Sequence, residues 1–356
     1  MHIVGNRPQF IKLALLYKEL SLRHAAGIIV HTGQHFDENM SDIFFSQLRI
    51  PSPQYSLSIN KMPHNEMIGN MLIQIDRILV KEKPDLVVVY GDTNSTLAGA
   101  LASRKRNIVL AHVEAGVRTG DLRMPEESNR YLTDRMADYN FCCTYLGVKN
   151  LEAEGFGTKD VSSQVFNSGD LMLDATRFFG KIASEKSSIH KTSGLPRHFI
   201  LTSIHREENN ENPDRLRNIV QGLNRIHADT PVFMPLHPKT KRLLLSQGIE
   251  TGFIVSEPLG YLDMLLLLQK CGSVITDSGG LSREAFFLGK PTLVVMRCPF
   301  WPELFIHGNC AQADGLTDDI PGKHRALIAS DKPFDINIFG DGHAAENISS
   351  AIMNSF

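Results

Sequence analysis

The sequence predicts an α/β protein of two doubly wound domains, each a parallel sheet with helices on both faces. Strand-like runs of Val, Ile and Leu alternate with helical patterns along all 356 residues, and this alternation is typical of right-handed βαβ units. The apolar runs are continuous rather than interrupted by polar residues, which indicates strands buried on both faces. The length also favours two domains over one.

In the first half of the chain, apolar runs predict strands and amphipathic segments predict helices. The helical segments repeat apolar residues at i, i+3, i+4 and i+7, most clearly in IKLALLYKEL and MIGNMLIQIDRIL. The predicted strands are residues 1–4, 27–32, 85–91, 107–113 and 139–143. The predicted helices are residues 10–23, 38–48, 65–82 and 95–105.

The second half restarts the same pattern after a polar, irregular stretch within residues 168–195. We take this stretch as the boundary, so the expected domains are residues 1–170 and 171–356. The helix-like segment 342–356 could pack back on the first domain. The predicted strands of the second half are residues 198–205, 230–237, 252–257, 272–277 and 291–296. The predicted helices are residues 212–226, 240–247, 261–270 and 281–289.

Composition excludes several classes of function. The chain is 42% hydrophobic and 21% charged, an ordinary globular mixture, with a formal net charge of −2. No global positive field therefore favours nucleic acid or an anionic membrane. No apolar run reaches the length of a transmembrane helix, and the N-terminus lacks a signal-peptide pattern. The five cysteines are scattered without CxxC spacing, which argues against a disulfide framework and a zinc site. These features predict a cytoplasmic enzyme.

Polar, glycine-containing segments follow four of the predicted strands. Because the carboxyl ends of parallel strands meet at one edge of a sheet, such segments are typical of ligand sites. The most charged of them could instead be a solvated loop with surface ion pairs. The four segments are GNRPQFIK (5–12), YGDTNST (90–96), AHVEAGVRTGDLRMPEESNR (111–130) and TDSGG (276–280).

Two of these segments are suited to a diphosphate. Arg7 and Lys12 would project near a helix N-terminus, and residues 278–280 would offer backbone N–H groups at the start of another helix. The DSGG sequence also matches a serine-protease nucleophile motif, but its strand-to-helix context argues against that function. Glu284, one turn further on, could accept hydrogen bonds from ribose hydroxyls, or simply pair with Arg283 or solvent.

Four residues are candidates for proton transfer. Asp92, Glu114 and Glu126 supply carboxylates, and His205 closes the predicted strand 198–205. Each has a structural alternative: Asp92 could be a helix N-cap, Glu126 suits the first turn of a helix, and a histidine at a strand end is often structural.

In their order and spacing, these motifs resemble the non-hydrolysing UDP-N-acetylglucosamine 2-epimerases. The resemblance covers essentially the whole chain, including VVVYGDTNSTLAGALAS, TSIHREEN, FMPLHPKTK, EPLGYLDM and TDSGGLSREAFFLGKP. It implies the GT-B fold, in which two Rossmann-like domains face a cleft. It also implies a UDP-sugar substrate, inversion of the sugar at C2 to give UDP-N-acetylmannosamine, and a homodimer. No metal or nicotinamide cofactor is expected.

The resemblance also assigns roles to individual residues. Proton transfer falls on Asp92, Glu114, Glu126 and His205. Substrate binding falls on Arg7, Lys12, Arg130, Pro258, Leu259, Tyr261, Ser278, Gly279, Gly280 and Glu284. An activator site, which binds a second substrate molecule in some bacterial members, would involve Gln34, His35 and His237.

The chemistry explains why this reaction needs such residues. The hydrogen on C2 is not next to a carbonyl, so a carboxylate alone would remove it too slowly. If UDP departs first or concertedly, positive charge at C1 acidifies the C2–H bond, and a glycal forms. Reprotonation from the opposite face and return of UDP complete the inversion. The site must stabilise the leaving diphosphate, present acid and base on opposite faces, and exclude water. Spacing does not show which carboxylate is the base.

The sequence departs from the family pattern near the predicted site. In RCPFWPEL, Phe300 and Trp301 occupy the positions of a Glu and an Arg found in many bacterial members. Gln9 replaces a usual Glu, and Ser282–Arg283 replaces Gln-Glu or Gln-Lys. Trp at position 301 also occurs in a related group that includes enzymes acting on UDP-diacetamido-uronic acids. The departures therefore leave the sugar open.

Three alternatives to the non-hydrolysing epimerase remain. A hydrolysing relative would release UDP and free N-acetylmannosamine. A GT-B glycosyltransferase would need an acceptor. A UDP-sugar sensor would bind without turnover, although all four candidate acid/base residues are retained.

Overall fold

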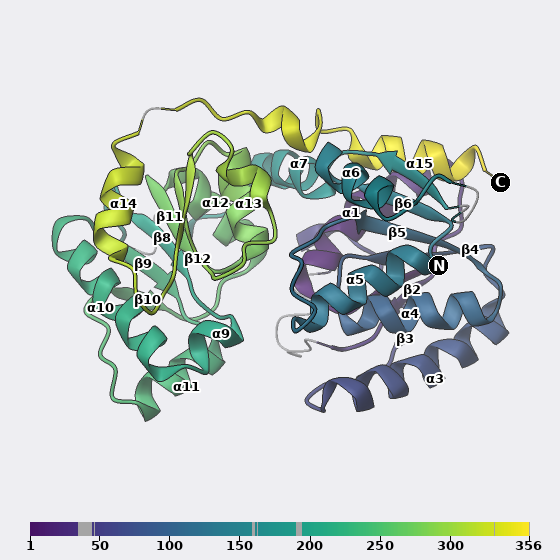
Figure 1. Ribbon diagram of the computed structural model, residues 1–356, viewed down its shortest axis with the longest axis horizontal. Coiled ribbons are helices and arrows are strands. Elements are labelled where there is room, and N and C mark those ends of the chain that lie inside the picture. The colour runs from purple at the N-terminus through teal and green to yellow at the C-terminus, as the bar shows by residue number, and fades with distance from the viewer. Residues whose placement is uncertain are drawn as a thin grey trace. The chain divides into compact units, whose positions relative to one another are not determined.

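The computed structural model describes residues 1–34, 45, 47–158, 161, 163–189, 194–330 and 332–355. The chain forms two compact units. Unit 1 comprises Met1–Ala175 and Asn337–Phe356, and unit 2 comprises Thr176–Ile336. Both termini therefore belong to unit 1 (Figure 1). The predicted helix 38–48 falls mainly outside the described residues, and His35 falls outside them entirely.

Unit 1 contains a seven-stranded parallel sheet in the order β3-β2-β1-β4-β5-β6-β7. The chain winds outward from β1 in one direction and then from β4 in the other. The end of β1 and the end of β4 thus form a topological switch point, where open α/β sheets bind ligands. The strands are β1 (His2–Val4), β2 (Ile29–His31), β3 (Tyr55–Ser56), β4 (Leu86–Tyr90), β5 (Val109–Ala115), β6 (Tyr139–Cys142) and β7 (Gln164–Asn167).

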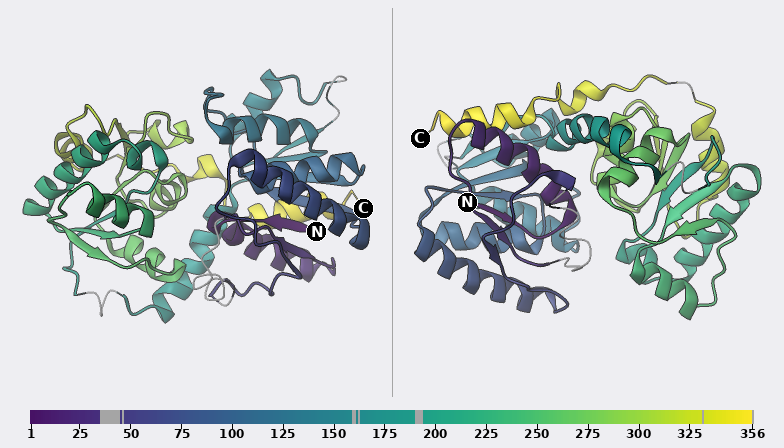
Figure 2. Two further views of the ribbon diagram at one scale, coloured as in Figure 1. Left: turned by 90° about the horizontal axis from the view of Figure 1, so that it is seen from below. Right: turned by 180° about the vertical axis from the view of Figure 1, so that it is seen from behind.

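Helices cover both faces of this sheet (Figure 2). On one face α3, α4 and α5 pack in a row, and the apolar side of α3 buries Met71 and Ile75 against Ile3 and Val89 of the sheet. On the other face α15 packs along α1, so the last helix of the chain belongs to unit 1. The helices are α1 (Arg7–Leu22), α3 (His64–Glu82), α4 (Asn94–Lys105), α5 (Pro125–Met136), α6 (Tyr145–Ala153), α7 (Leu171–Lys186) and α15 (Ala344–Met353).

Unit 2 contains a six-stranded parallel sheet in the order β10-β9-β8-β11-β12-β13, with its switch point between β8 and β11. Its main core lies where α10 and α14 cover the sheet, with Ile219, Leu223 and Leu293 fully buried. The strands are β8 (Ile200–Ser203), β9 (Val232–Pro235), β10 (Ile254–Ser256), β11 (Ser273–Thr276), β12 (Thr292–Val295) and β13 (Cys310–Ala313). The helices are α9 (Glu207–Asn210), α10 (Pro213–Asp229), α11 (Pro238–Ser246), α12 (Tyr261–Lys270), α13 (Gly279–Phe287) and α14 (Ile320–Ile328), with 3₁₀ turns η1 (Pro302–Phe305) and η2 (Ile336–Phe339).

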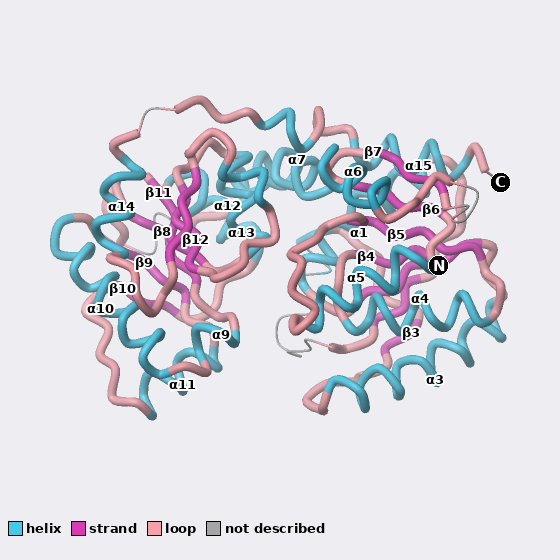
Figure 3. Tube along the Cα trace, in the orientation of Figure 1, coloured by secondary structure: helices cyan, strands magenta, loops and turns pink. Residues whose placement is uncertain are grey.

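The predicted fold class, two doubly wound parallel sheets, is confirmed. One prediction is wrong in part: the stretch taken as an irregular boundary is helical up to Lys186, where α7 ends (Figure 3). The reason is a spacing of four residues that puts Ala175, Phe179 and Ala183 on one buried face despite the polar residues around them. Among the described residues, no helix is both long and apolar enough to cross a membrane.

Candidate active site

The first part of the site in unit 1 is an ion pair between α1 and β5. Lys12 Nζ donates to Glu114 Oε2 at 2.5 Å, and the two side chains are only 3% and 11% exposed. The pair brings together a predicted diphosphate ligand and a predicted acid/base residue. In this structure the ammonium of Lys12 therefore neutralises the carboxylate of Glu114.

Glu114 itself has a strained backbone. Its φ is +73°, a region that residues other than glycine rarely adopt. The register between β5 and β6 shifts at this point, between Val113 and Ala115, so Glu114 lies in an irregularity of the strand. Such a conformation costs about 1–3 kcal/mol and is common where a side chain is redirected for function. Two residues on, Gly116 is required because a Cβ there would lie 2.3 Å from the carbonyl oxygen of Gly147.

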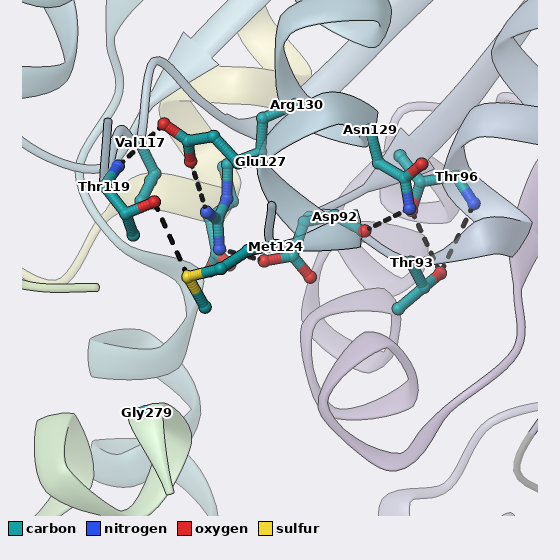
Figure 4. Close-up of polar contacts among 12 residues, drawn as sticks. Asp92, Thr93, Thr96, Val117, Thr119, Met124, Glu127, Asn129, Arg130 and Gly279 are labelled. Atoms are coloured by element: carbon teal, nitrogen blue, oxygen red, sulfur yellow. Dashed lines mark hydrogen bonds and ion pairs between the residues drawn. The ribbon is translucent and has the colours of Figure 1, made fainter. Parts of the chain in front are cut away.

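The second part of the site surrounds Arg130 on α5 (Figure 4). The guanidinium of Arg130 pairs with the carboxylates of Asp92 and Glu127, with Nη1 2.8 Å from Glu127 Oε2. The Arg130 side chain is 3% exposed and Asp92 is 25% exposed. Burial lowers the pKa of Arg130, but the two carboxylates outweigh it, so its pKa is raised. The arginine thus stays charged and holds Asp92 in place.

Asp92 does not act as the N-cap of α4, which was the structural alternative to a role in the site. Thr93, not Asp92, is the N-cap, and its hydroxyl accepts a hydrogen bond from the backbone N–H of Thr96 (Figure 4). The carboxylate of Asp92 is therefore directed to Arg130, while its carbonyl oxygen accepts from Asn129 Nδ2 at 2.9 Å. Glu126 lies half-buried in the first turn of α5, where an acidic side chain favours the helix dipole.

A buried histidine supports both loops of this site. His112 on β5 has Nδ1 2.6 Å from Asp134 Oδ1 and Nε2 2.7 Å from the carbonyl oxygen of Gly91. The other oxygen of Asp134 pairs with Arg118 at 2.7 Å. Burial raises the pKa of Asp134, but His112 and Arg118 outweigh it, so the pKa is lowered. This cluster fixes the loop before Asp92 and the loop after Glu114.

The switch point of unit 1 is bridged by Gln9. Its amide oxygen accepts from the backbone N–H of Gly5 at 2.6 Å, and its nitrogen donates to the carbonyl oxygen of Tyr90 at 2.6 Å. The same nitrogen lies 3.0 Å from the hydroxyls of Thr93 and Thr96. Gln9 thereby ties the turn that carries Arg7 to the end of β4. Nearby, Gln34 Oε1 accepts from the backbone N–H of Ser95 at 3.0 Å.

One group of described residues in unit 1 has ligand atoms that could hold a metal ion. Oxygen or sulfur atoms of Glu114, Cys143 and Asp170 lie within 4.8 Å of one another. Lys12 already supplies a positive charge to this group through Glu114.

In unit 2, the predicted phosphate-binding residues form the start of α13. Ser278 is the N-cap, and its hydroxyl accepts from the backbone N–H of Leu281 at 3.2 Å. Gly279 and Gly280 are the first two helical residues, so their N–H groups lie at the positive end of the helix. A Cβ at Gly279 would lie 3.2 Å from Phe300, which shows how closely the loop after β12 approaches this turn.

The departures at Phe300 and Trp301 are matched by two arginines. The guanidinium carbon of Arg283 lies 4.0 Å from the ring centre of Trp301, and that of Arg206 lies 4.3 Å from the ring centre of Phe300. These are cation–π distances. Arg283 and Trp301 thus form one stacked pair, which links α13 to the loop after β12.

His205 lies beside this turn because β8 pairs with β11. The His205 side chain is 41% exposed, and its Nδ1 lies 3.2 Å from Ser203 Oγ and 3.5 Å from Asp277 Oδ1. The ring of His237, a predicted activator residue that caps α11, is centred 6.5 Å from the ring of His205.

The residues of unit 2 that were predicted to bind uracil and ribose lie at α12 and α13. The hydroxyl of Tyr261, the first residue of α12, donates to Glu284 Oε1 at 2.8 Å, and both residues are buried. Pro258 and Leu259 are half-buried in the loop that leads into α12.

Five residues that organise these segments were not predicted as site residues: Gln9, His112, Glu127, Asp134 and Asp277. Glu127, for example, accepts from the backbone N–H groups of Thr119 and Gly120 at 2.8 Å each. The available signal was a polar residue one to four positions from a predicted site residue, in a strand, a helix or the turn between them. That signal does not distinguish buried from exposed side chains.

Comparison with known proteins identifies close relatives. The family described as UDP-N-acetylglucosamine 2-epimerase matches residues 18–353. The UDP-2,3-diacetamido-2,3-dideoxy-D-glucuronate 2-epimerase of Pseudomonas aeruginosa is 44% identical over 348 residues, which cover 97% of each chain. The UDP-N-acetylglucosamine 2-epimerase of Methanocaldococcus jannaschii is 37% identical and covers 97% of this chain and 96% of its own.

Solved structures show the same likeness. The crystal structure of the Methanocaldococcus jannaschii UDP-GlcNAc 2-epimerase in complex with UDP-GlcNAc and UDP superposes with a TM-score of 0.93, at 35% identity and 99% coverage of each chain. The Neisseria meningitidis enzyme bound to UDP-GlcNAc has a TM-score of 0.89, at 28% identity and 99% coverage of each chain.

Proposed function

Since this chain belongs to the UDP-N-acetylglucosamine 2-epimerase family, we propose that it inverts C2 of UDP-N-acetylglucosamine to give UDP-N-acetylmannosamine. The observation that carries this proposal is the pair of carboxylates at the ends of two adjacent strands. Asp92 follows β4, Glu114 lies on β5, and each carboxylate is paired with a buried cation. Acid/base chemistry at C2 needs two such groups.

The reaction would begin with cleavage of the bond between C1 and the β-phosphate oxygen, whose electrons leave with UDP. Loss of the C2 proton to a carboxylate forms the C1–C2 double bond. A second acid then protonates C2 from the opposite face, and the phosphate oxygen adds back to C1. The oxidation state of the sugar is unchanged overall, so the cycle needs no oxidant or reductant.

We assign the two tasks to the two units. Asp92, Glu114 and Glu126 of unit 1 would move protons and stabilise positive charge at C1. The start of α13 in unit 2 would hold the leaving diphosphate, with Arg7 of unit 1 as a further cation. Tyr261, Glu284 and the loop with Pro258 and Leu259 would hold the uridine.

Turnover in D₂O tests the proposal. Purified protein with UDP-N-acetylglucosamine should yield UDP-N-acetylmannosamine with deuterium at C2, detected by NMR. Asp92→Asn and Glu114→Gln should each lower kcat by about 10²-fold or more, with UDP affinity nearly unchanged. A product without deuterium would exclude proton exchange at C2. Release of free N-acetylmannosamine would identify the hydrolysing alternative.

A second candidate substrate is a UDP-diacetamido-uronic acid. It is favoured by the relative named for UDP-2,3-diacetamido-2,3-dideoxy-D-glucuronate and by the arginines stacked on Phe300 and Trp301. Arg206, which is half-buried, adds positive charge at the carboxyl edge of the second sheet, which suits a sugar carboxylate. Comparison of kcat/KM for the two UDP-sugars separates the candidates.

Three expectations stay predictions. Gln34, His35 and His237 would form an activator site, the protein would be a homodimer, and it would be cytoplasmic. A sigmoidal dependence of rate on substrate would support the first, and light scattering would test the second. Cell fractionation would test the third.

A further inference from the structure

Asp277 joins the two strand ends at the switch point of unit 2. Its carboxylate is fully buried and faces three N–H donors from the segment after β8. The backbone N–H of His205 lies 3.1 Å from both oxygens, and that of Arg206 lies 3.0 Å from Oδ2. Asn209 Nδ2 donates to the same oxygen at 3.0 Å. The backbone of Asp277 adds two bonds, from its N–H to Ser203 and from Arg206 Nε to its carbonyl oxygen.

A second layer keeps this carboxylate in place. Asn209 is fully buried, and its amide nitrogen also donates to the carbonyl oxygen of Val295 on β12 at 2.9 Å. Its amide oxygen accepts from Nε and Nη2 of Arg215, a side chain that is 1% exposed. Asp277 is therefore held by a buried network that reaches β12 through Asn209 and α10 through Arg215.

The carboxylate also faces the His205 ring. Asp277 Oδ1 is 3.5 Å from Nδ1, on the side of the ring where Ser203 Oγ lies at 3.2 Å. A negative oxygen beside Nδ1 favours a proton on that nitrogen. With that proton in place, Nε2 on the opposite side of the ring would be the nitrogen available to accept from a ligand.

We propose that Asp277 is a positioning residue for His205: it fixes the backbone of the loop and selects the orientation and tautomer of the imidazole. This rests on the proposed function, together with the role in proton transfer that the family resemblance implies for His205. It extends that function to a residue that touches no substrate, since its carboxylate is filled by donors of the protein itself.

The test combines Asp277→Asn with His205→Asn. Asparagine keeps the size of the side chain and one acceptor oxygen, but it removes the negative charge. Its amide N–H₂ group would also face one or more of the N–H donors that surround Asp277. We expect Asp277→Asn to lower kcat about tenfold or more, with KM and UDP affinity changed by less than about twofold. In the His205→Asn background, the same substitution should change kcat by less than about twofold, because coupled residues are not additive.

A control variant and a second readout separate positioning from folding. Asp318→Asn removes a carboxylate of unit 2 that accepts a backbone N–H from Asp314 at 2.6 Å, and it should leave kcat unchanged. In ¹⁵N-histidine-labelled protein, the His205 signal is the one lost in His205→Asn. It should report a proton on Nδ1 in the wild type and a shift toward the Nε2–H tautomer in Asp277→Asn.

Equal losses of kcat in both backgrounds, or an unchanged tautomer, would overturn the proposal. Wild-type protein that turns over no UDP-sugar would instead overturn the proposed function, and the tautomer measurement would still decide the role of Asp277.

Discussion

The two switch points of the molecule are built on the same plan but bridged by different side chains. In unit 1, Gln9 ties the turn after β1 to the end of β4. In unit 2, Asp277 ties the end of β11 to the segment after β8. Both side chains are buried, at 2% and 0% exposed. Each bridge holds a turn that carries candidate ligands, Arg7 in one unit and His205 in the other.

The partners of each bridge explain the choice of side chain. Gln9 must accept from one N–H group and donate to the carbonyl oxygen of Tyr90, which a primary amide does and a carboxylate cannot. Asp277 faces only donors, which suit a carboxylate. The amide of Gln9 therefore suits the local hydrogen bonds of this chain. In both units the bridging residue matches the hydrogen-bond roles of its buried partners. Gln9 faces both a donor and an acceptor, and Asp277 faces donors.

The same contrast extends to the surrounding sites. The edge of the first sheet is organised by side-chain charges of opposite sign, as in the pairs of Lys12 with Glu114 and Arg130 with Asp92. The edge of the second sheet is organised by backbone N–H groups, a helix start and arginines stacked on aromatic rings. Paired carboxylates suit proton transfer, and N–H groups suit an anion. The following variants test this division.

The largest effect is expected from Arg130→Met. Methionine fills much of the space but leaves the carboxylates of Asp92 and Glu127 without their shared cation, and Glu127 is fully buried. Breaking a buried ion pair costs about 3–5 kcal/mol, so the free energy of unfolding should fall by that amount, measured by urea titration. Arg130→Met combined with Glu127→Gln should recover part of the loss. No recovery in the double variant would show that packing, rather than charge, dominates at the edge of unit 1.

A smaller loss of stability is expected when the amide of Gln9 is replaced by a carboxylate, the group that Asp277 supplies in unit 2. In Gln9→Glu, an ionised carboxylate would face the carbonyl oxygen of Tyr90 at a distance of about a hydrogen bond, at a cost of about 1–3 kcal/mol. The protonated acid could still donate to Tyr90 and accept from Gly5. The pKa of the new Glu should therefore be raised in the folded state.

The sign of the pH dependence follows from that direction. A raised pKa in the folded state means that stability is retained at low pH and lost as pH rises through the folded value. The deficit of Gln9→Glu relative to the wild type should be larger at about pH 8 than at about pH 5 in urea titrations. A deficit that is independent of pH would contradict the assignment of the bridging hydrogen bonds.

Much of the fold could be predicted from the sequence because buried parallel strands and amphipathic helices leave strong local patterns. The strands 85–91 and 272–277 illustrate this, since β4 and β11 lie within them. The short edge strands β3, β7 and β13 were not predicted. They have only two to four residues each and partly exposed side chains, so they carry little apolar signal.

The sequence predicts which segments carry the site, but it does not predict the contacts between their residues. The sequence places Lys12 and Glu114 in separate motifs, and nothing local shows that they form an ion pair across 102 positions. The strained backbone of Glu114 likewise depends on its pairing with β6, which is a tertiary contact. The sequence DTNST also leaves both Asp92 and Thr93 as possible caps of the next helix, and only the structure identifies Thr93 as the N-cap.

The smallest effect concerns acid stability, where both units contain a similar buried histidine. Burial lowers the pKa of His31 in unit 1 and of His324 in unit 2 from 6.5 to about 4. His324 Nε2 lies 2.8 Å from Ser273 Oγ in the core of its unit. A neutral histidine in the folded state means that stability is lost as pH falls below the unfolded value of 6.5, until the folded value is reached. Each histidine should lower the free energy of unfolding by about 1 kcal/mol as the pH falls from about 7 to about 5.5.

The single tryptophan allows the pH dependence of stability to be measured for unit 2 alone. Trp301 belongs to unit 2 and is 4% exposed, so its emission should shift to the red when that unit unfolds. In His324→Gln, the urea midpoint followed by Trp301 fluorescence should fall less between about pH 7 and pH 5.5 than in the wild type. His31→Gln is the matched control in unit 1 and should leave the pH dependence of the Trp301 transition unchanged. If both variants flatten it equally, the two units unfold as one cooperative body, which would contradict the assignment of the Trp301 transition to unit 2 alone.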